Sequence, residues 1–66
     1  TIAYYPKYTG TSTSIVTALA SVGEKDTSKT HRAKIAKANG IANYTGTAYQ
    51  NTQMSIRLKQ GKLIKA

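Results

Sequence analysis

The intervals between hydrophobic residues predict three short helices, at residues 12–22, 28–39 and 48–60 of the 66-residue chain. In the first of these, Ile15 and Leu19 lie one turn apart and begin a continuous apolar face. The second has a thin apolar face of mostly small residues, and the third has a less regular pattern. The other apolar residues that we expect on these three faces are Val16, Ala18, Ala20 and Val22, then Ala33, Ile35, Ala36 and Ala38, then Ala48, Met54, Ile56 and Leu58.

Glycines and a repeated tetrapeptide mark the ends of these helices. Gly23, Gly40 and Gly61 each follow or end a predicted helix, where glycine accepts the left-handed backbone conformation that stops it. The letters Tyr-Thr-Gly-Thr occur at residues 8–11 and again at residues 44–47, each time before a helix. We interpret both copies as one device, in which tyrosine anchors a turn, glycine makes it and threonine caps the next helix. The glycines whose replacement by alanine we expect to be destabilising, where φ is positive, are Gly10, Gly40 and Gly46.

Both ends of the chain have the composition of short strands. Residues 1–8 are rich in Ile and Tyr, which favour extended structure, and Pro6 restricts that strand to an edge. Residues 62–65 form a second such segment, and antiparallel pairing with residues 2–5 is the arrangement that gives it a partner. The sequence therefore predicts a small α+β domain that is mostly α, with three short helices between paired antiparallel terminal strands, in the order β-α-α-α-β.

The charge of the chain is strongly positive. Ten Lys and Arg residues stand against two acids, Glu24 and Asp26, which gives a formal net charge of +8. Such a balance favours a polyanionic partner: nucleic acid, an anionic membrane surface or an anionic cell-wall polymer. All five aromatic residues are tyrosines, which combine an apolar face with a hydroxyl group and suit sugars and wet interfaces. We expect at least two of the five to belong to the core.

The residue content also argues against several kinds of site. The chain has no Cys and one His, too few for a zinc cluster of the usual kinds, so we expect no metal and no cofactor. No apolar run approaches the roughly 20 residues that span a bilayer, so we expect no membrane insertion. His31 has basic neighbours and no evident carboxylate partner, and we interpret Glu24 and Asp26 as caps and solubilising charges. We therefore expect this chain not to be an enzyme.

The length of the chain corresponds to a single domain, residues 1–66. Its core must be small, which makes homo-oligomerisation a candidate source of added stability. The first residues show no secretion-signal pattern, and we interpret the chain as a fragment of a longer protein.

Five segments resemble, in order and spacing, the C-terminal cell-wall-binding domain of phage endolysins and bacterial autolysins. Two of them are also loosely similar to LysM modules, although the extra helix and the Tyr-Thr-Gly-Thr turns are not LysM-like. The five segments are residues 4–10 (YYPKYTG), 35–41 (IAKANGI), 43–47 (NYTGT), 50–51 (QN) and 58–64 (LKQGKLI).

This resemblance implies a non-catalytic targeting module that binds the Gram-positive cell wall through peptidoglycan or an anionic polymer such as teichoic acid. It implies a bacteriolytic, antimicrobial parent hydrolase, an N-acetylmuramoyl-L-alanine amidase or a peptidase, with its catalytic domain upstream. Such a protein is phage-encoded, made in the host cytoplasm and active at the wall, outside the membrane. We expect tyrosines to stack on sugars, amides to bind hydroxyl and acetamido groups, and cations to hold phosphate-bearing polymers. The residues that we expect to contact the wall are Tyr5, Lys7, Asn43, Tyr49, Gln50 and Asn51.

The alternative function is that of a small basic DNA-binding domain of the helix-turn-helix type. Residues 36–41 resemble the turn of that motif, whose second helix begins soon after the glycine and enters the major groove. Here the connection is longer, and Gly46 occupies the position of a buried aliphatic residue. The third helix carries basic residues only late in its length, at Arg57 and Lys59. We therefore prefer wall binding and expect no nucleic-acid partner.

Overall fold

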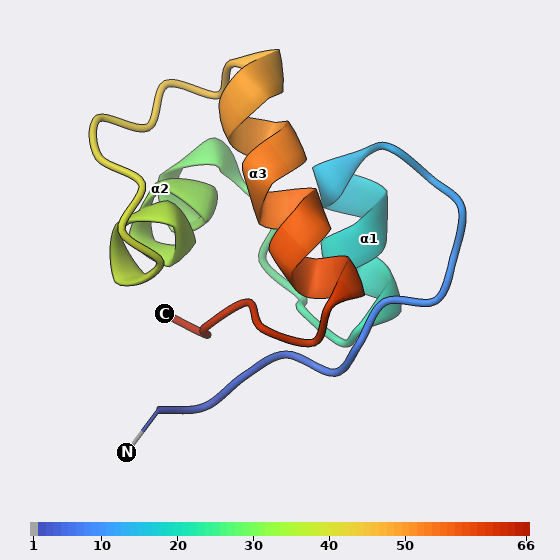
Figure 1. Ribbon diagram of the computed structural model, residues 1–66. Coiled ribbons are helices and arrows are strands. Elements are labelled where there is room, and N and C mark those ends of the chain that lie inside the picture. The colour runs from blue at the N-terminus through green and yellow to red at the C-terminus, as the bar shows by residue number, and fades with distance from the viewer. Residues whose placement is uncertain (1) are drawn as a thin grey trace.

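The computed structural model describes residues 2–66 and contains three α-helices in that range (Figure 1). α1 spans Ile15–Ser21, α2 spans Lys29–Ala38 and α3 spans Ala48–Lys59. α3 packs against α1, and α2 lies on the other side of α3 in the view of Figure 1. The three helices that the hydrophobic pattern predicts are confirmed, with α1 shorter than expected at its beginning.

The predicted β-α-α-α-β architecture is wrong, because residues 2–66 contain no strand and no sheet, and the domain is all-α. What remains of the expected pairing is one isolated antiparallel bridge between Tyr4 and Ile64. The two terminal segments thus lie side by side, as Figure 1 shows, without forming strands. Two backbone hydrogen bonds flank the bridge, from Tyr5 N–H to Leu63 C=O at 2.9 Å and from Lys65 N–H to Ala3 C=O at 2.8 Å.

The terminal pairing stops because the next residue of the C-terminal segment that would pair is bonded elsewhere. The Gly61 N–H, which would continue the ladder, donates to Leu58 C=O at the end of α3, at 3.1 Å. The next backbone hydrogen bond of the N-terminal segment runs from Tyr8 N–H to the same Leu58 C=O, at 3.0 Å. The N-terminal segment therefore turns away from the C-terminal segment and docks on a helix instead.

A side chain, and not a strand, occupies the other edge of the C-terminal segment. Asn39, the C-cap residue of α2, is buried with 6% of its surface exposed. Its Nδ2 donates to Ile64 C=O at 3.0 Å and to Ile35 C=O at 2.8 Å, and its Oδ1 accepts from Ile64 N–H at 2.8 Å. The carboxamide offers the same donor and acceptor as a peptide group, so it satisfies Ile64 as a neighbouring strand would. The sequence pattern predicted only a helix end here.

The core draws on all three helices and on both terminal segments. Tyr5 and Tyr8 are buried in it, which confirms that at least two tyrosines are core residues. The register of α3 differs from the prediction: Ser55 is buried and its hydroxyl has no partner among residues 2–66, while Ile56 is 44% exposed. The ten buried hydrophobic residues are Tyr5, Tyr8, Ile15, Ala18, Leu19, Ile35, Ala36, Met54, Leu58 and Leu63.

Candidate functional site

The second Tyr-Thr-Gly-Thr segment, residues 44–47, folds as its sequence predicts. Gly46 has a φ of +82°, the left-handed conformation that glycine adopts without a Cβ penalty. The Thr47 hydroxyl caps α3 by accepting a hydrogen bond from the Gln50 N–H at 3.2 Å. In turn the Gln50 side-chain oxygen accepts a hydrogen bond from the Thr47 N–H, which completes a capping box. This turn fixes the start of α3 and hence the direction of its side chains.

The first copy, residues 8–11, folds differently. The N-cap of α1 is Ser14, whose hydroxyl accepts from Thr17 N–H, so the cap predicted at Thr11 is wrong. Gly10 is not among the glycines with positive φ, so the predicted reason for glycine is also wrong here. Instead the Tyr8 ring lies against Gly10, where an added Cβ would come within 2.7 Å of the ring atom Cε1. The tyrosine does anchor this turn, because its hydroxyl accepts the Ser12 N–H at 3.1 Å.

The amides predicted to bind the wall are engaged inside the α2–α3 connection. Gln50 Oε1 accepts from Thr45 N–H at 2.9 Å, and its Nε2 donates to Asn43 C=O at 3.0 Å. Asn51 Oδ1 accepts from the Tyr44 hydroxyl, and its Nδ2 donates to the carbonyl of the neighbouring turn glycine at 3.4 Å. Asn43 itself is exposed and has a φ of +54°. The structure brings these predicted residues together, but mainly as partners of one another and of the loop.

Tyr5, another predicted contact residue, belongs to a partly buried polar cluster. It is 4% exposed, and its hydroxyl donates to the Glu24 carboxylate. His31 Nε2 lies 2.9 Å from the same Glu24 oxygen, so His31 does have a carboxylate partner and that prediction was wrong. No local signal pointed to this pair, since Glu24 lies in the α1–α2 connection, seven residues before His31. Glu24 thus ties the N-terminal segment to α2.

The pKa values of this cluster follow from its contacts. Burial, then the hydrogen bond to Glu24 and its charge, raise the pKa of Tyr5 well above the usual 10.0. The hydrogen bond from Tyr5 is the main cause that lowers the pKa of Glu24 below its ordinary value of 4.5. Hydrogen bonds from Ser28 likewise lower the pKa of Asp26, which is solvent-exposed.

The lowered pKa of Glu24 predicts acid sensitivity. The folded state binds fewer protons than the unfolded state below the ordinary glutamate pKa of 4.5, so stability is lost as pH falls below that value. Urea unfolding midpoints between pH 7 and pH 3 measure this loss, and we expect Glu24→Gln to flatten the profile. Asp26→Asn is the control, and this variant should still show the loss of stability at low pH that Glu24 causes. Equal slopes for the wild type and Glu24→Gln would contradict the assignment.

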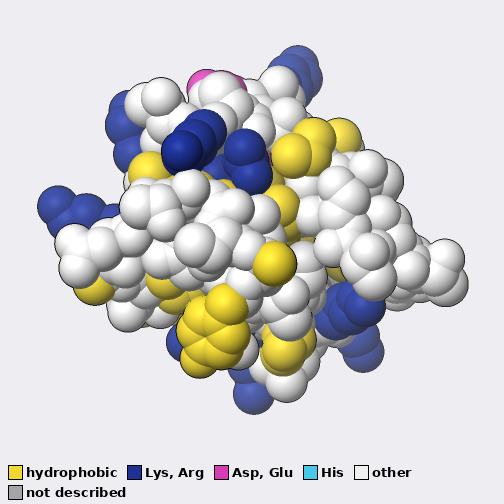
Figure 2. All heavy atoms as spheres, turned by 90° about the horizontal axis from the view of Figure 1, so that it is seen from above, with side chains coloured by type: hydrophobic (Ala, Val, Ile, Leu, Met, Phe, Trp, Pro, Cys, Tyr) yellow, Lys and Arg dark blue, Asp and Glu magenta, His cyan; other side chains and the backbone are white. Residues whose placement is uncertain are grey.

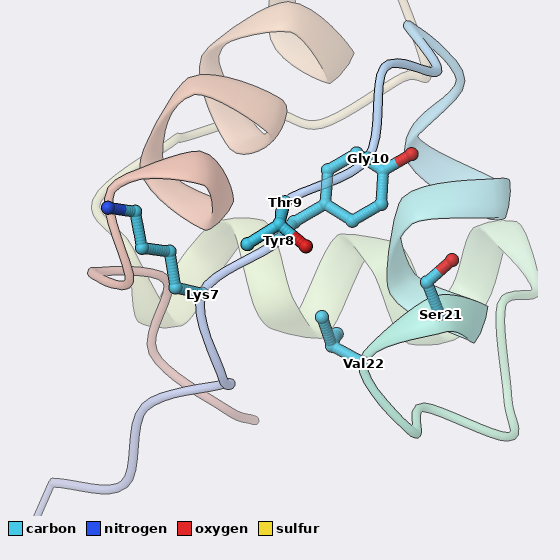
Figure 3. Close-up of a pocket in the computed structure, with 6 residues that line it drawn as sticks. All are labelled: Lys7, Tyr8, Thr9, Gly10, Ser21 and Val22. Carbon is cyan, nitrogen blue, oxygen red and sulfur yellow. The ribbon is translucent and has the colours of Figure 1, made fainter.

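A hollow of about 270 Å³ lies between the N-terminal segment and the end of α1 (Figure 3). Figure 3 shows the Lys7 side chain extending away from the lining residues on α1, and the Tyr8 ring between the N-terminal segment and α1. The Ser21 hydroxyl on its wall donates to Thr17 C=O at 3.0 Å. One polar group of the hollow is thus engaged within α1, while Lys7, a predicted contact residue, is exposed at its edge.

Tyr49, the remaining predicted contact residue, is the most exposed of the large hydrophobic residues at 74%. It shares one side of α3 with Thr52, Gln53 and Ile56, at intervals of three, four and seven residues. We call these four residues the outer face of α3. Of these four residues, the sequence pattern identified only Tyr49. It placed Ile56 in the core, and nothing in the sequence distinguished the free amide of Gln53 from the other amides.

The positive charge of the domain lies mostly on its surface and has no carboxylate partners among the described residues. Among residues 2–66 no Lys or Arg forms an ion pair with a carboxylate, and the short acid–base contact is that of His31 with Glu24. Arg32 is half-buried, where Nη1 donates to the Tyr44 hydroxyl at 3.1 Å, and the other nine cations are exposed. Figure 2 shows Lys and Arg side chains at many points around one face, with acidic atoms at one place only.

Residues 2–66 contain no cluster of three or more His, Asp or Glu side chains placed to hold a metal ion. None of the helices in this part of the chain is long and apolar enough to span a membrane.

Two curated phage proteins are similar to part of this chain. It is 53% identical over 36 residues to an endolysin of Listeria phage A511, a match that covers 54% of this chain and 11% of that protein. It is 51% identical over 37 residues to the L-alanyl-D-glutamate peptidase of Listeria phage A118, covering 56% of this chain and 13% of that protein. No profile of a known protein family matches the chain, and no solved structure is significantly similar. The chain is thus related over about half its length to phage endolysins, of which it spans a small part.

Proposed function

We propose that this chain is the non-catalytic module that holds a phage peptidoglycan hydrolase on the Gram-positive cell wall. The catalytic domain, an amidase or a peptidase, then belongs to the rest of the longer protein, which acts outside the host membrane. The similarity to an endolysin and to an L-alanyl-D-glutamate peptidase supports the choice of parent enzyme. The match covers only a small share of each relative, which supports the interpretation of this chain as an accessory module rather than a whole enzyme.

The observation that carries this proposal is the unneutralised cationic surface. Both carboxylates make contacts within the domain: Glu24 with Tyr5 and His31, and Asp26 with the Ser28 N–H at 3.0 Å. The exposed lysines and arginines are therefore free to attract an external polyanion. A Gram-positive wall presents phosphate-bearing polymers and carboxylates in high density, so many weak contacts act together there.

The geometry of the α2–α3 connection gives little support to DNA binding. α2 ends at Ala38 and α3 begins at Ala48, which leaves residues 39–47 between them. A helix-turn-helix motif joins its helices through about three or four residues. α3 is moreover basic only in its last turn, whereas a recognition helix contacts bases with its N-terminal residues.

Binding of the fluorescently labelled chain to purified Gram-positive sacculi tests this function. We expect binding that weakens several-fold between low and physiological salt, because exposed charges are screened over about 8 Å at physiological ionic strength. The variant Lys29→Gln/Lys34→Gln/Lys37→Gln should bind less and show a weaker salt dependence. A comparison of intact sacculi with sacculi from which acid has removed teichoic acid distinguishes binding to teichoic acid from binding to peptidoglycan.

Two results would contradict the proposal. One is the absence of binding to intact or extracted sacculi from several species. The other is efficient displacement of the bound chain by duplex DNA at physiological salt, which would favour the alternative function.

A further inference from the structure

The outer face of α3 presents two large hydrophobic side chains to solvent. Tyr49 is 74% exposed and Ile56 is 44% exposed, although the opposite side of the helix buries Met54 and Leu58 completely. We propose that this face binds the glycan strand of peptidoglycan, with Tyr49 stacked on a sugar ring. The proposal rests on the wall-binding function and names its ligand and its contact surface.

The spacing along the helix suits an extended ligand. Tyr49 and Ile56 are seven residues apart, so they point in nearly the same direction and are separated by about 10.5 Å along the axis. That distance is close to the length of two linked sugar rings. The glycan strand, which repeats in disaccharide units, can therefore meet both side chains while it lies along α3.

The polar residues between them are free to bind. The side chains of Thr52 and Gln53 make no hydrogen bond to other residues in the described range 2–66; Thr52 is exposed and Gln53 is half-buried. By contrast, Gln50 and Asn51 on the neighbouring side use their amide groups within the α2–α3 connection. A hydroxyl and a carboxamide between two apolar platforms fit the hydroxyl and acetamido groups of an amino sugar better than they fit an apolar protein surface.

The charge around the outer face favours the same ligand. α3 contains no acidic residue, and its last turn contributes Arg57 and Lys59, both exposed. Neither is paired with a carboxylate among the residues that the structure describes. The outer face thus adjoins cations that attract the negatively charged wall, while its own side chains are neutral and suited to sugars.

The test compares two exposed tyrosines on different parts of the surface. The chain is titrated onto acid-extracted sacculi, which retain peptidoglycan and lack teichoic acid. We expect Tyr49→Ala to weaken binding about tenfold, which corresponds to about 1.4 kcal/mol, and Tyr49→Phe to bind like the wild type. The matched control is Tyr4→Ala, which removes a tyrosine that is 51% exposed on the N-terminal segment and should leave binding unchanged. Far-UV circular dichroism and a thermal melt verify that each variant is folded.

Soluble tetra-N-acetylchitotetraose, a sugar chain without a peptide, distinguishes the glycan from the stem peptide. We expect it to compete with extracted sacculi for the wild type and not for the folded Tyr49→Ala variant. Unchanged binding by Tyr49→Ala, equal weakening by Tyr4→Ala, or no competition by the oligosaccharide would each overturn this inference. In those cases wild-type binding to sacculi shows that the proposed function still stands, whereas loss of wild-type binding refutes the function itself.

Discussion

Replacing Asn39 by alanine is expected to lower the free energy of unfolding by about 3 kcal/mol, since it leaves the half-buried N–H and C=O of Ile64 without a partner, at about 1–3 kcal/mol each. The wild-type amide bonds to Ile64 N–H, Ile64 C=O and Ile35 C=O. Without it, the C-terminal segment loses its link to α2 and retains its contacts with the N-terminal segment. A domain of this length has a total stability of about 3–10 kcal/mol, so the variant should lose about a third of it or more.

The matched control for Asn39→Ala is Gln60→Ala. Gln60 is also an amide at a helix C-cap, that of α3, but its side chain is exposed. Urea denaturation followed by circular dichroism should show a change within about 0.5 kcal/mol for this control, as is usual for surface substitutions. If both variants lose the same stability, the hydrogen bonds between the Asn39 side chain and the Ile64 backbone do not hold the C-terminal segment in place.

Gly10→Ala is expected to destabilise the domain by about 2–3 kcal/mol, because the new methyl group overlaps the Tyr8 ring and forces the packed core to shift. The Cβ would lie 2.5 Å from Cζ of that ring. Tyr8 is 7% exposed and its hydroxyl is bonded to Ser12 N–H, so the ring has little room to move away.

Gly40→Ala separates this steric effect from backbone strain. Gly40 has a φ of +78°, and a Cβ there would meet nothing within 4 Å. Alanine at this position should cost only the left-handed backbone penalty, about 1 kcal/mol. Removing the ring by Tyr8→Leu should relieve much of the Gly10→Ala cost and leave that of Gly40→Ala unchanged. Additive effects of Tyr8→Leu and Gly10→Ala in a double-mutant cycle would contradict the overlap.

The helices were predictable from the sequence, whereas the terminal strands were not. Periodic apolar residues and local capping signals specify a helix within one stretch of chain, as with Ile15 and Leu19 or the capping box at Thr47. A strand depends on a partner from elsewhere, and here the pairing ends after a single bridge because the Gly61 N–H is bonded to Leu58 C=O of α3. The edge of the C-terminal segment that faces away from the N-terminal segment is taken by the side chain of Asn39, which no periodic pattern reveals.

The repeated tetrapeptide shows why residue letters alone did not determine local structure. Gly46 is required by its positive φ, while Gly10 is required by the ring of Tyr8 that covers it. Thr47 caps a helix and Thr11 does not, since the α1 cap lies three residues later at Ser14. The sequence predicted a turn at both copies, but the tertiary packing determines which role the glycine and the threonine have in each.

The candidate site was predicted in part. The exposure of Tyr49 agrees with a contact role, which stays a prediction until binding is measured. Gln50 and Asn51 have the right chemistry for sugars, but their amides serve the loop before α3. Gln53, only two residues further on, has the same chemistry and a free side chain. Helical register separates these amides, and the irregular pattern of α3 did not fix that register.

The central claim is tested most directly by a binding isotherm of the labelled chain on purified Gram-positive sacculi at physiological salt. We predict saturable binding that is retained on sacculi of at least one species and is not displaced by duplex DNA. An isotherm that stays at background on sacculi from several species would contradict the claim that this chain is a wall-binding module.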